Sequence, residues 1–313
     1  MAGKDLLSVA DLSGDDIRLL ISNTVEMKAE RRLSMLDGKI LALLFEKPSL
    51  RTKVSFEVAM QQLGGHAVYL SPTEVGLGQR ESVADVAQVL SRYVDAIAAR
   101  TFAQQTLEVL ASYSNVPVIN ALSDLEHPCQ ALADFFTIFE KKGELEGVTL
   151  AFIGDGNNVA HSLLLAASLT GMNFRIASPP GYGVQESIMR LAQGFAMESG
   201  AELLFTEEPH SAVNQADVVY TDVWASMGQE AEAERRRQLF ARYQVNEELI
   251  SLAKADVIFM HPLPAHHGQE VAEGILESLP SVVFDQAENR LHLQKALLAQ
   301  MLGGLEIPLT GYH

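Results

Sequence analysis

The chain has 313 residues with 40 acidic and 23 basic side chains, which gives a formal net charge of −17. A chain this acidic repels nucleic acid at long range and has no broad basic face. We therefore expect no nucleic-acid partner, and any anion site must be local. Hydrophobic residues make up 48% of the chain, but charged or polar residues interrupt every apolar run before the roughly 20 residues of a membrane-spanning helix, so we expect no membrane association.

Short apolar runs, of the kind that form buried parallel strands, alternate with longer segments of helical period in the first half of the chain. The predicted strands are residues 40–45, 67–70, 96–99 and 116–119. The predicted helices are residues 55–64, 82–93 and 103–113, followed by a fourth that opens with His127, Pro128 and Gln130. The polar, glycine-punctuated segment 141–147 predicts a linker after this fourth helix.

The same alternation restarts beyond the linker. Further strands are predicted at residues 148–154, 174–178, 201–205, 217–221, 256–260 and 281–285, and a last helix at about 288–302. Such alternation predicts parallel sheets covered by helices on both faces. The expected fold is α/β, with two tandem doubly wound parallel-sheet domains and a C-terminal helix that packs back on the first. We expect domains at 1–143 and 144–287, with the returning helix in 288–313.

A basic cluster, KPSLRT, follows the first predicted strand at the start of a predicted helix. In open parallel sheets, ligands collect beyond the carboxyl ends of the strands, where helix N-termini can receive an anion. Ser49 and Thr52 supply hydroxyl donors, and the guanidinium of Arg51 can grip phosphate or carboxylate at two points. The competing interpretation is that Ser49 is only a helix N-cap and that Arg51 and Lys53 are solvated.

Other polar residues stand at further strand ends of the same predicted sheet. Arg100 follows the strand 96–99, and His127 and Gln130 follow the strand 116–119. Each residue by itself fits a structural role, since lone histidines and surface arginines are common. Together with Arg51 they fall at one edge of one sheet, which predicts a single anion site.

These motifs resemble those of a known family. SLRTK and HPCQALAD are similar to the carbamoyl-phosphate-binding motifs of the aspartate and ornithine carbamoyltransferases, and DVWASMGQE, residues 222–230, is similar to their ornithine-binding motif. GDGNNVAHS and HPLPAHHGQEV also match, and the resemblance covers nearly the whole chain. It implies transfer of the carbamoyl group of carbamoyl phosphate to the side-chain amine of L-ornithine, giving L-citrulline, in arginine metabolism. It also implies a homotrimer or a multiple of it, with active sites between domains and between neighbouring subunits.

The resemblance implies a role for each matching residue. The phosphate would be held by Ser49, Leu50 through its backbone N–H, Arg51 and Thr52. The rest of carbamoyl phosphate would be held by Arg100, His127, Gln130, Pro262, Leu263 and Arg290. Ornithine would be held by Asn158, Asp222, Ser226 and Met227. The residues expected to act catalytically are Arg51, Thr52, Arg100 and His127, since donors of this kind stabilise charge on the carbonyl oxygen and on the departing phosphate.

The chain departs from the family pattern at two places. It reads HPLP at residues 261–264, where most ornithine enzymes have HCLP, so Pro262 removes a thiol and a backbone N–H but keeps the carbonyl. Leu263 precedes Pro264, which permits a cis peptide there. The second departure is Gly76, where the family commonly has glutamine, and Gln79 or Arg80 would have to substitute.

Several alternatives stay open. The GDGNN turn suggests a dinucleotide-binding oxidoreductase, although Val159 stands where the third glycine would be. Putrescine, an acylated ornithine or aspartate are other acceptors, and a noncatalytic protein of the same fold is a further class. We expect direct transfer without metal or organic cofactor, and we read His266 and His267 as solvated or structural. The lone cysteine, Cys129, is not expected to be a nucleophile, and it can form no intrachain disulfide, which together with the absence of a signal-peptide pattern predicts a cytoplasmic protein.

Overall fold

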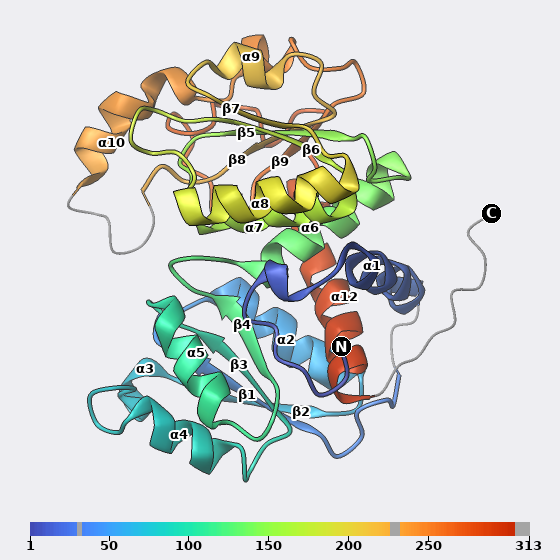
Figure 1. Ribbon diagram of the computed structural model, residues 1–313, viewed down its shortest axis with the longest axis vertical. Coiled ribbons are helices and arrows are strands. Elements are labelled where there is room, and N and C mark those ends of the chain that lie inside the picture. The colour runs from blue at the N-terminus through green and yellow to red at the C-terminus, as the bar shows by residue number, and fades with distance from the viewer. Residues whose placement is uncertain (30–32, 226–231, 304–313) are drawn as a thin grey trace. The chain divides into compact units, whose positions relative to one another are not determined.

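The computed structural model describes residues 1–29, 33–225 and 232–303. The chain forms two compact units, the first made of Met1–Phe136 and Glu288–His313 and the second of Thr137–Ala287. Each unit is a parallel sheet flanked by helices (Figure 1). The α/β class with two parallel-sheet units is therefore confirmed. The boundaries 143/144 and 287/288 stay predictions; the division between the units falls inside α6, Pro128–Lys142.

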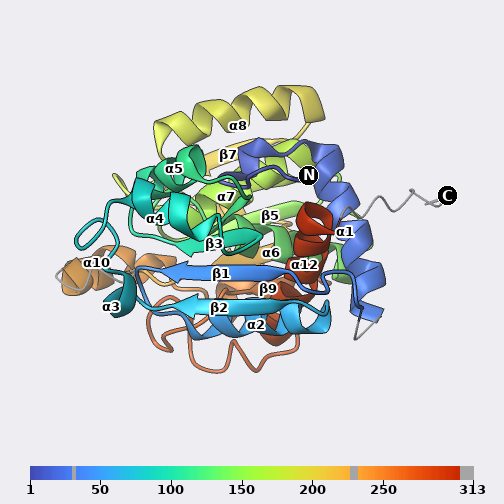
Figure 2. The same cartoon turned by 90° about the horizontal axis from the view of Figure 1, so that it is seen from below.

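The first unit has a four-stranded parallel sheet in the order β2-β1-β3-β4. Its strands are β1 Ile40–Phe45, β2 His66–Leu70, β3 Ala96–Arg100 and β4 Val118–Leu122. Its helices are η1 Val9–Asp11, α1 Gly14–Ala29, α2 Leu50–Gln62, α3 Pro72–Val75, α4 Val83–Leu90 and α5 Gln104–Tyr113, with α6 leading out of it. Figure 2 shows α4 and α5 on one face of this sheet and α2 on the other.

Side chains alternate between the two faces of this sheet, as the pleat requires. Ala42 and Leu44 of β1 join Ile97 and Ala99 of β3 in a core cluster with Leu107 and other residues of α4 and α5. The intervening residues of β1 point to the other face and are also buried. Burial on both faces explains why β1 reads as a continuous apolar run in the sequence.

The last helix, α12 Val283–Leu302, packs in the first unit through its C-terminal part, as expected. Two lysine side chains join it to α1. Nζ of Lys28 donates to Oδ1 of Asn289 at 2.9 Å, and Nζ of Lys295, which is buried, donates to the carbonyl of Met27 at 2.9 Å. The helix thereby brings residues near 290 to the first sheet.

The second unit has a five-stranded parallel sheet in the order β7-β6-β5-β8-β9. Its strands are β5 Thr149–Ile153, β6 Asn173–Ala177, β7 Leu203–Thr206, β8 Val218–Thr221 and β9 Ile258–Met260. Its helices are α7 Asn158–Thr170, α8 Glu186–Ser199, α9 Pro209–Val213, α10 Ala233–Phe240, η3 Ala241–Tyr243 and α11 Glu247–Ile250. In Figure 1, α7 and α8 lie on one face of this sheet and α9 on the other. The central pair β5 and β8 carries the site described below.

One predicted element is wrong. Residues 281–285 form no strand: Ser281 makes a single parallel bridge with Phe259, and α12 begins at Val283. The backbone pairs with β9 only through Phe259, whose carbonyl accepts from the N–H of Val282 at 3.0 Å. The N–H of Gln286 then donates to the carbonyl of Val282 at 2.8 Å, which is already a helical bond.

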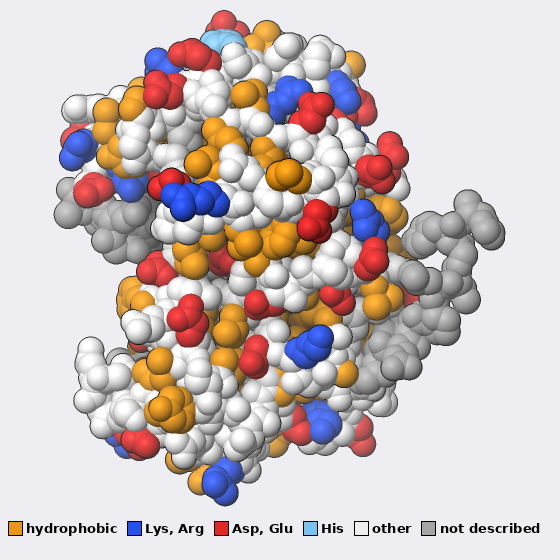
Figure 3. Space-filling model, viewed as in Figure 1, with side chains coloured by type: hydrophobic (Ala, Val, Ile, Leu, Met, Phe, Trp, Pro, Cys, Tyr) orange, Lys and Arg blue, Asp and Glu red, His pale blue; other side chains and the backbone are white. Residues whose placement is uncertain are grey.

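The described helices include none with both the length and the apolar character that a bilayer crossing requires. Figure 3 shows acidic and basic side chains interspersed over the face in view.

Candidate active site

The junction of β1 and α2 presents backbone donors with hydroxyl groups. Ser49 caps α2, because its Oγ accepts from the backbone N–H of Thr52 at 3.3 Å. Ser49 is therefore an N-cap, and this role leaves its hydroxyl hydrogen available to a ligand. Leu50, the first helical residue, has 76% of its surface exposed, and its backbone N–H is one of those that a helix N-terminus leaves without an intrahelical partner. These groups form the start of an anion site.

Arg100 stands beside this junction at the end of β3. It pairs in register with Phe45, and its carbonyl accepts from the N–H of Glu46 at 2.8 Å. Only 7% of Arg100 is exposed. Burial, and after it the charges of Arg290 and Arg51, lower the pKa of Arg100 to about 10. Its Nε is buried and has no hydrogen-bond partner among the described residues.

Arg290 reaches the same place from α12. Its Nη2 donates to Oγ1 of Thr52 at 2.7 Å, and both side chains are buried. The bond uses a lone pair of Thr52 and leaves its hydroxyl hydrogen free to donate elsewhere. Arg290 has the largest effect of the charges that act on both Arg100 and His127.

His127 and Gln130 complete this cluster at the start of α6. Burial, followed by the positive charges of Arg290, Arg100 and Lys47, holds the pKa of His127 well below its ordinary value. His127 is therefore a neutral imidazole near pH 7 and can donate one hydrogen bond without carrying charge. Nε2 of Gln130 donates to Oδ1 of Asp134 at 2.8 Å, and Oε1 of Gln130 is buried with no hydrogen-bond partner among the residues that the structure describes.

The cluster in the first unit therefore suits an anion that also carries an amide-like group. Guanidinium groups and the start of α2 attract phosphate oxygens, while a neutral imidazole and a carboxamide oxygen can bond to a C=O and an NH₂ respectively. The mutual repulsion of Arg51, Arg100 and Arg290 is relieved when an anion binds among them.

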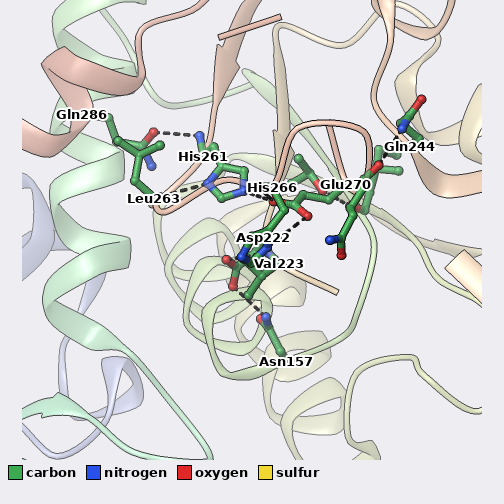
Figure 4. Close-up of polar contacts among 12 residues, drawn as sticks. Asn157, Asp222, Val223, Gln244, His261, Leu263, His266, Glu270 and Gln286 are labelled. Atoms are coloured by element: carbon green, nitrogen blue, oxygen red, sulfur yellow. Dashed lines mark hydrogen bonds and ion pairs between the residues drawn. The ribbon is translucent and has the colours of Figure 1, made fainter. Parts of the chain in front are cut away.

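In the second unit, Asp222 follows β8 and is buried (Figure 4). Its Oδ2 accepts from Nδ2 of Asn157 at 2.7 Å, and its Oδ1 accepts from the N–H of Val223 at 2.8 Å. Burial raises the pKa of Asp222, although His261 and the bond from Asn157 act in the opposite direction. A buried carboxylate of this kind gains from a bound cation, such as an ammonium group.

Asn157, the neighbour of the predicted ornithine-binding Asn158, is the amide that contacts Asp222. Its Oδ1 caps α7 by accepting from the N–H groups of Val159 and Ala160, so both ends of the carboxamide are used. Asn158 is the first residue of α7. The sequence signal for Asn157 was its place before a helix, where asparagine is a preferred N-cap.

A turn after β9 carries Pro262 and Leu263 (Figure 4). Leu263 has φ 57°, a backbone conformation that residues other than glycine rarely adopt. The Leu263–Pro264 peptide bond is cis, as the sequence permits. The ring of His261 holds this turn, because its Nδ1 accepts from the N–H of Leu263 at 2.9 Å. Its Nε2 then carries the hydrogen and faces Oε1 of Glu270 at 3.3 Å.

The structure around Gly156 argues against the interpretation that the GDGNN turn binds a dinucleotide. A Cβ at this position would lie 2.3 Å from the carbonyl carbon of Gly183 and 2.4 Å from the nitrogen of Val184. The N–H of Gly156 also donates to the carbonyl of Tyr182 at 2.7 Å. The space that a pyrophosphate would need against this glycine is therefore filled by the chain itself.

Residues 4–140 match the family model described as the carbamoyl-P binding domain of aspartate/ornithine carbamoyltransferase, and residues 146–301 match its Asp/Orn binding domain. The chain belongs to the aspartate/ornithine carbamoyltransferase family. An ornithine carbamoyltransferase of Anoxybacillus flavithermus is 54% identical over 306 residues, which cover 96% of this chain and 98% of that protein. An anabolic ornithine carbamoyltransferase of Pyrococcus furiosus is 51% identical over 310 residues, covering 98% of each chain. The solved structure of the Pyrococcus furiosus enzyme has a TM-score of 0.95 and covers 97% of this chain and 99% of its own.

The residues predicted to hold carbamoyl phosphate fall into two places. The second unit contains Pro262 and Leu263, as it does Asp222, while the first unit contains Ser49, Leu50, Arg51, Thr52, Arg100, His127, Gln130 and Arg290. The predicted Ser226 and Met227 lie outside the described residues. Among the described residues, no three His, Cys, Asp or Glu side chains are grouped so that they could hold a metal ion.

Lys47 was left without a role by the sequence reasoning. Its ammonium lies 4.7 Å from the centre of the Phe102 ring, and burial, followed by the charge of Arg100, lowers its pKa. Its charge also acts on His127. Lys47 is therefore a further cation beside Arg100 and His127, and the sequence signal for it was its place in the basic KPSLRT segment.

Proposed function

We propose that this protein transfers the carbamoyl group from carbamoyl phosphate to the side-chain amine of L-ornithine, producing L-citrulline and phosphate. The observation that carries the proposal is the convergence of Arg51 and Arg290 on Arg100, with Arg290, Arg100 and Lys47 around a neutral His127. Such a site combines cations for a phosphate group with an uncharged donor for a carbonyl oxygen. Membership in the carbamoyltransferase family supports the same donor.

In the proposed reaction, the lone pair of the neutral amine attacks the carbonyl carbon, and the C=O electrons move to the oxygen. Arg100, His127 and the hydroxyl of Thr52 stabilise this oxygen. The C=O bond then re-forms as the bond between carbon and the phosphate oxygen breaks, and Arg51, Ser49 and the start of α2 receive the charge of the departing phosphate. The nitrogen loses its proton to the phosphate, which leaves as hydrogen phosphate. Counted from the ammonium form of ornithine, one proton is released overall.

Gln130 and the turn at Pro262 and Leu263 would accept hydrogen bonds from the carbamoyl NH₂. Oε1 of Gln130 is buried, has no hydrogen-bond partner in the described part of the chain, and is suited to this role. Backbone carbonyls at Pro262 and Leu263 need no side-chain chemistry, so proline at 262 is compatible with it. Both groups would orient the carbamoyl plane for attack.

Asp222 would bind the α-ammonium group of ornithine, with Asn157 holding the carboxylate in place. A buried carboxylate whose partners are the side-chain amide of Asn157 and the backbone N–H of Val223 favours a cationic ligand over a second carboxylate, which supports ornithine over aspartate. Relatives at 50–54% identity that are named ornithine carbamoyltransferase support the same acceptor. An N-acylated ornithine would lack the ammonium group that Asp222 attracts.

The deciding experiment compares acceptors side by side. Purified protein is given carbamoyl phosphate with ornithine, putrescine, N-acetylornithine or aspartate, and both the carbamoylated product and phosphate are measured. We expect ornithine to give the highest kcat/KM, with stoichiometric phosphate. A higher kcat/KM with another acceptor would replace the proposed substrate, and absence of product with all four would refute carbamoyl transfer to these amines.

We also propose a homotrimer, or a multiple of it, located in the cytoplasm and serving arginine biosynthesis. The family resemblance supports the trimer, the single buried Cys129 fits a reducing compartment, and the relative from Pyrococcus furiosus named anabolic supports the pathway. Light scattering after size-exclusion chromatography measures the assembly directly. A mass that is not a multiple of three chains would contradict the trimer.

A further inference from the structure

Arg236, on α10, is a buried arginine that none of the roles above uses. Only 7% of its side chain is exposed. Its guanidinium carbon lies 4.9 Å from the centre of the Tyr182 ring and 5.9 Å from that of Phe240. Aromatic faces at these distances favour a planar cation and restrict its orientation.

The guanidinium bridges two separate segments of the second unit. Its Nη1 donates to Oδ2 of Asp155 at 2.7 Å and to the backbone carbonyl of Trp224 at 2.8 Å. Asp155 belongs to the turn after β5, two residues before Asn157, and Trp224 is two residues after Asp222. One nitrogen therefore connects the segment that carries the carboxylate of Asp222 to the segment that carries its amide donor.

We propose that Arg236 is a positioning residue for the amino-acid acceptor: it fixes the segment around Trp224 against the turn at Asp155, and thereby holds the Asn157–Asp222 pair in its binding geometry. The inference rests on the proposed function, because it assigns the role of Arg236 to the acceptor site described there. Arg236 itself need not touch the acceptor.

Geometry, rather than stability, is the reason to keep this pair. A buried ion pair gives little net stability, because two desolvated charges cost about as much as their attraction returns, and apolar replacements of both partners are often neutral. Burial raises the pKa of Asp155 even with Arg236 beside it, which shows how costly this carboxylate is. A directional contact between two loops is what an apolar pair cannot provide.

The test separates positioning from folding. In Arg236→Met with Asp155→Asn, both charges are removed together, so no buried charge is left unpaired. We expect the thermal midpoint to change by only a few degrees, while KM for ornithine rises by about 10- to 100-fold, because a displacement of about 1 Å in a positioned group can cost up to about 100-fold. KM for carbamoyl phosphate should change by less than about twofold, since its proposed cations lie in the first unit.

Two further variants sharpen the result. Arg236→Lys keeps a cation near Asp155 but loses the planar group between the aromatic rings, so we expect a smaller rise in KM for ornithine in the same direction. Arg237→Met is the matched control on the same helix, because Arg237 is half-exposed and pairs only with Glu234 among the described residues; both KM values should stay at the wild-type level.

An unchanged KM for ornithine in the folded double variant and in Arg236→Lys would overturn the inference. Equal rises in both KM values would also overturn it, because they would indicate general damage to the fold. If wild-type protein does not use ornithine, the proposed function is refuted. That result is distinct from a failure of the inference about Arg236, which is judged from the variants against wild type.

Discussion

Arg100 should lower the free energy of unfolding of the unliganded protein while it strengthens the binding of carbamoyl phosphate. It is 7% exposed, and burial, then Arg290 and Arg51, lower its pKa to about 10. Because each pKa unit corresponds to about 1.4 kcal/mol, this fall from the ordinary value of an arginine amounts to roughly 3 kcal/mol by which the folded protein disfavours the charge. Its Nε also lacks a hydrogen-bond partner among the described residues.

Arg100→Met removes the charge and keeps an unbranched apolar side chain. We expect the free energy of unfolding without ligand to rise by about 1–3 kcal/mol, since apolar replacement of a poorly compensated buried charge is often stabilising. Inorganic phosphate, the product, should stabilise wild type by about 2.7 kcal/mol at a hundredfold excess over its Kd. At the same phosphate concentration the variant should gain much less, because a main cation of the site is gone.

The assay is urea denaturation followed by far-ultraviolet circular dichroism, with and without phosphate. Arg18→Met is the control, because Arg18 lies on α1, where half of its side chain is exposed; it should change neither the stability nor the response to phosphate by more than about 0.5 kcal/mol. The reasoning is refuted if Arg100→Met destabilises the unliganded protein, or if its response to phosphate equals that of wild type.

Three further outcomes follow from the pKa shifts. Asp222→Asn should raise KM for ornithine by about 10- to 100-fold. Because burial raises the pKa of Asp222, KM of the wild type should rise on acidification at a higher pH than it would for an ordinary carboxyl group. KM of the variant, measured from initial rates, should not show this rise. The lowered pKa of His127 means that the unfolded chain takes up a proton below about pH 6.5 that the folded chain does not, so stability should fall by up to about 1.4 kcal/mol per pH unit there, and His127→Asn should show a shallower loss in urea titrations. Burial raises the pKa of the Cys129 thiol to about 12, so iodoacetamide should leave native activity intact and Cys129→Ala should remain active; rapid inactivation would contradict this.

Residues whose role depends on strand ends were predictable. The run ILALLF ends where β1 ends, at Phe45, and the register of the parallel sheet then puts Arg100 beside it. Arg51, Arg100 and His127 could be grouped from sequence because the carboxyl ends of parallel strands meet at one edge. This rule needs only the order of apolar runs and no knowledge of side-chain packing.

Contacts over long sequence separations were not predictable by that rule. Arg290 and Thr52 are 238 residues apart, and only the family resemblance suggested that Arg290 belongs to the donor cluster. The segment 281–285 was misread because a short apolar run has the same appearance as a strand or as the start of a helix. The contact of Asn157 with Asp222 was not foreseen either, because it depends on which residue precedes the first helical turn, and helix ends are uncertain in sequence by more than one residue.

The turn at Pro262 explains why a cysteine is dispensable to its architecture. The N–H that bonds Nδ1 of His261 belongs to Leu263, and that of His261 donates to Oε1 of Gln286 at 2.9 Å, so the hydrogen bonds of this turn bypass position 262. A residue without an N–H is therefore tolerated there, and the positive φ falls on Leu263 instead. What position 262 gives to the proposed site is a backbone carbonyl, which every amino acid has. In the proposed reaction, the neutral form of the acceptor amine must then be favoured without a thiol at this position.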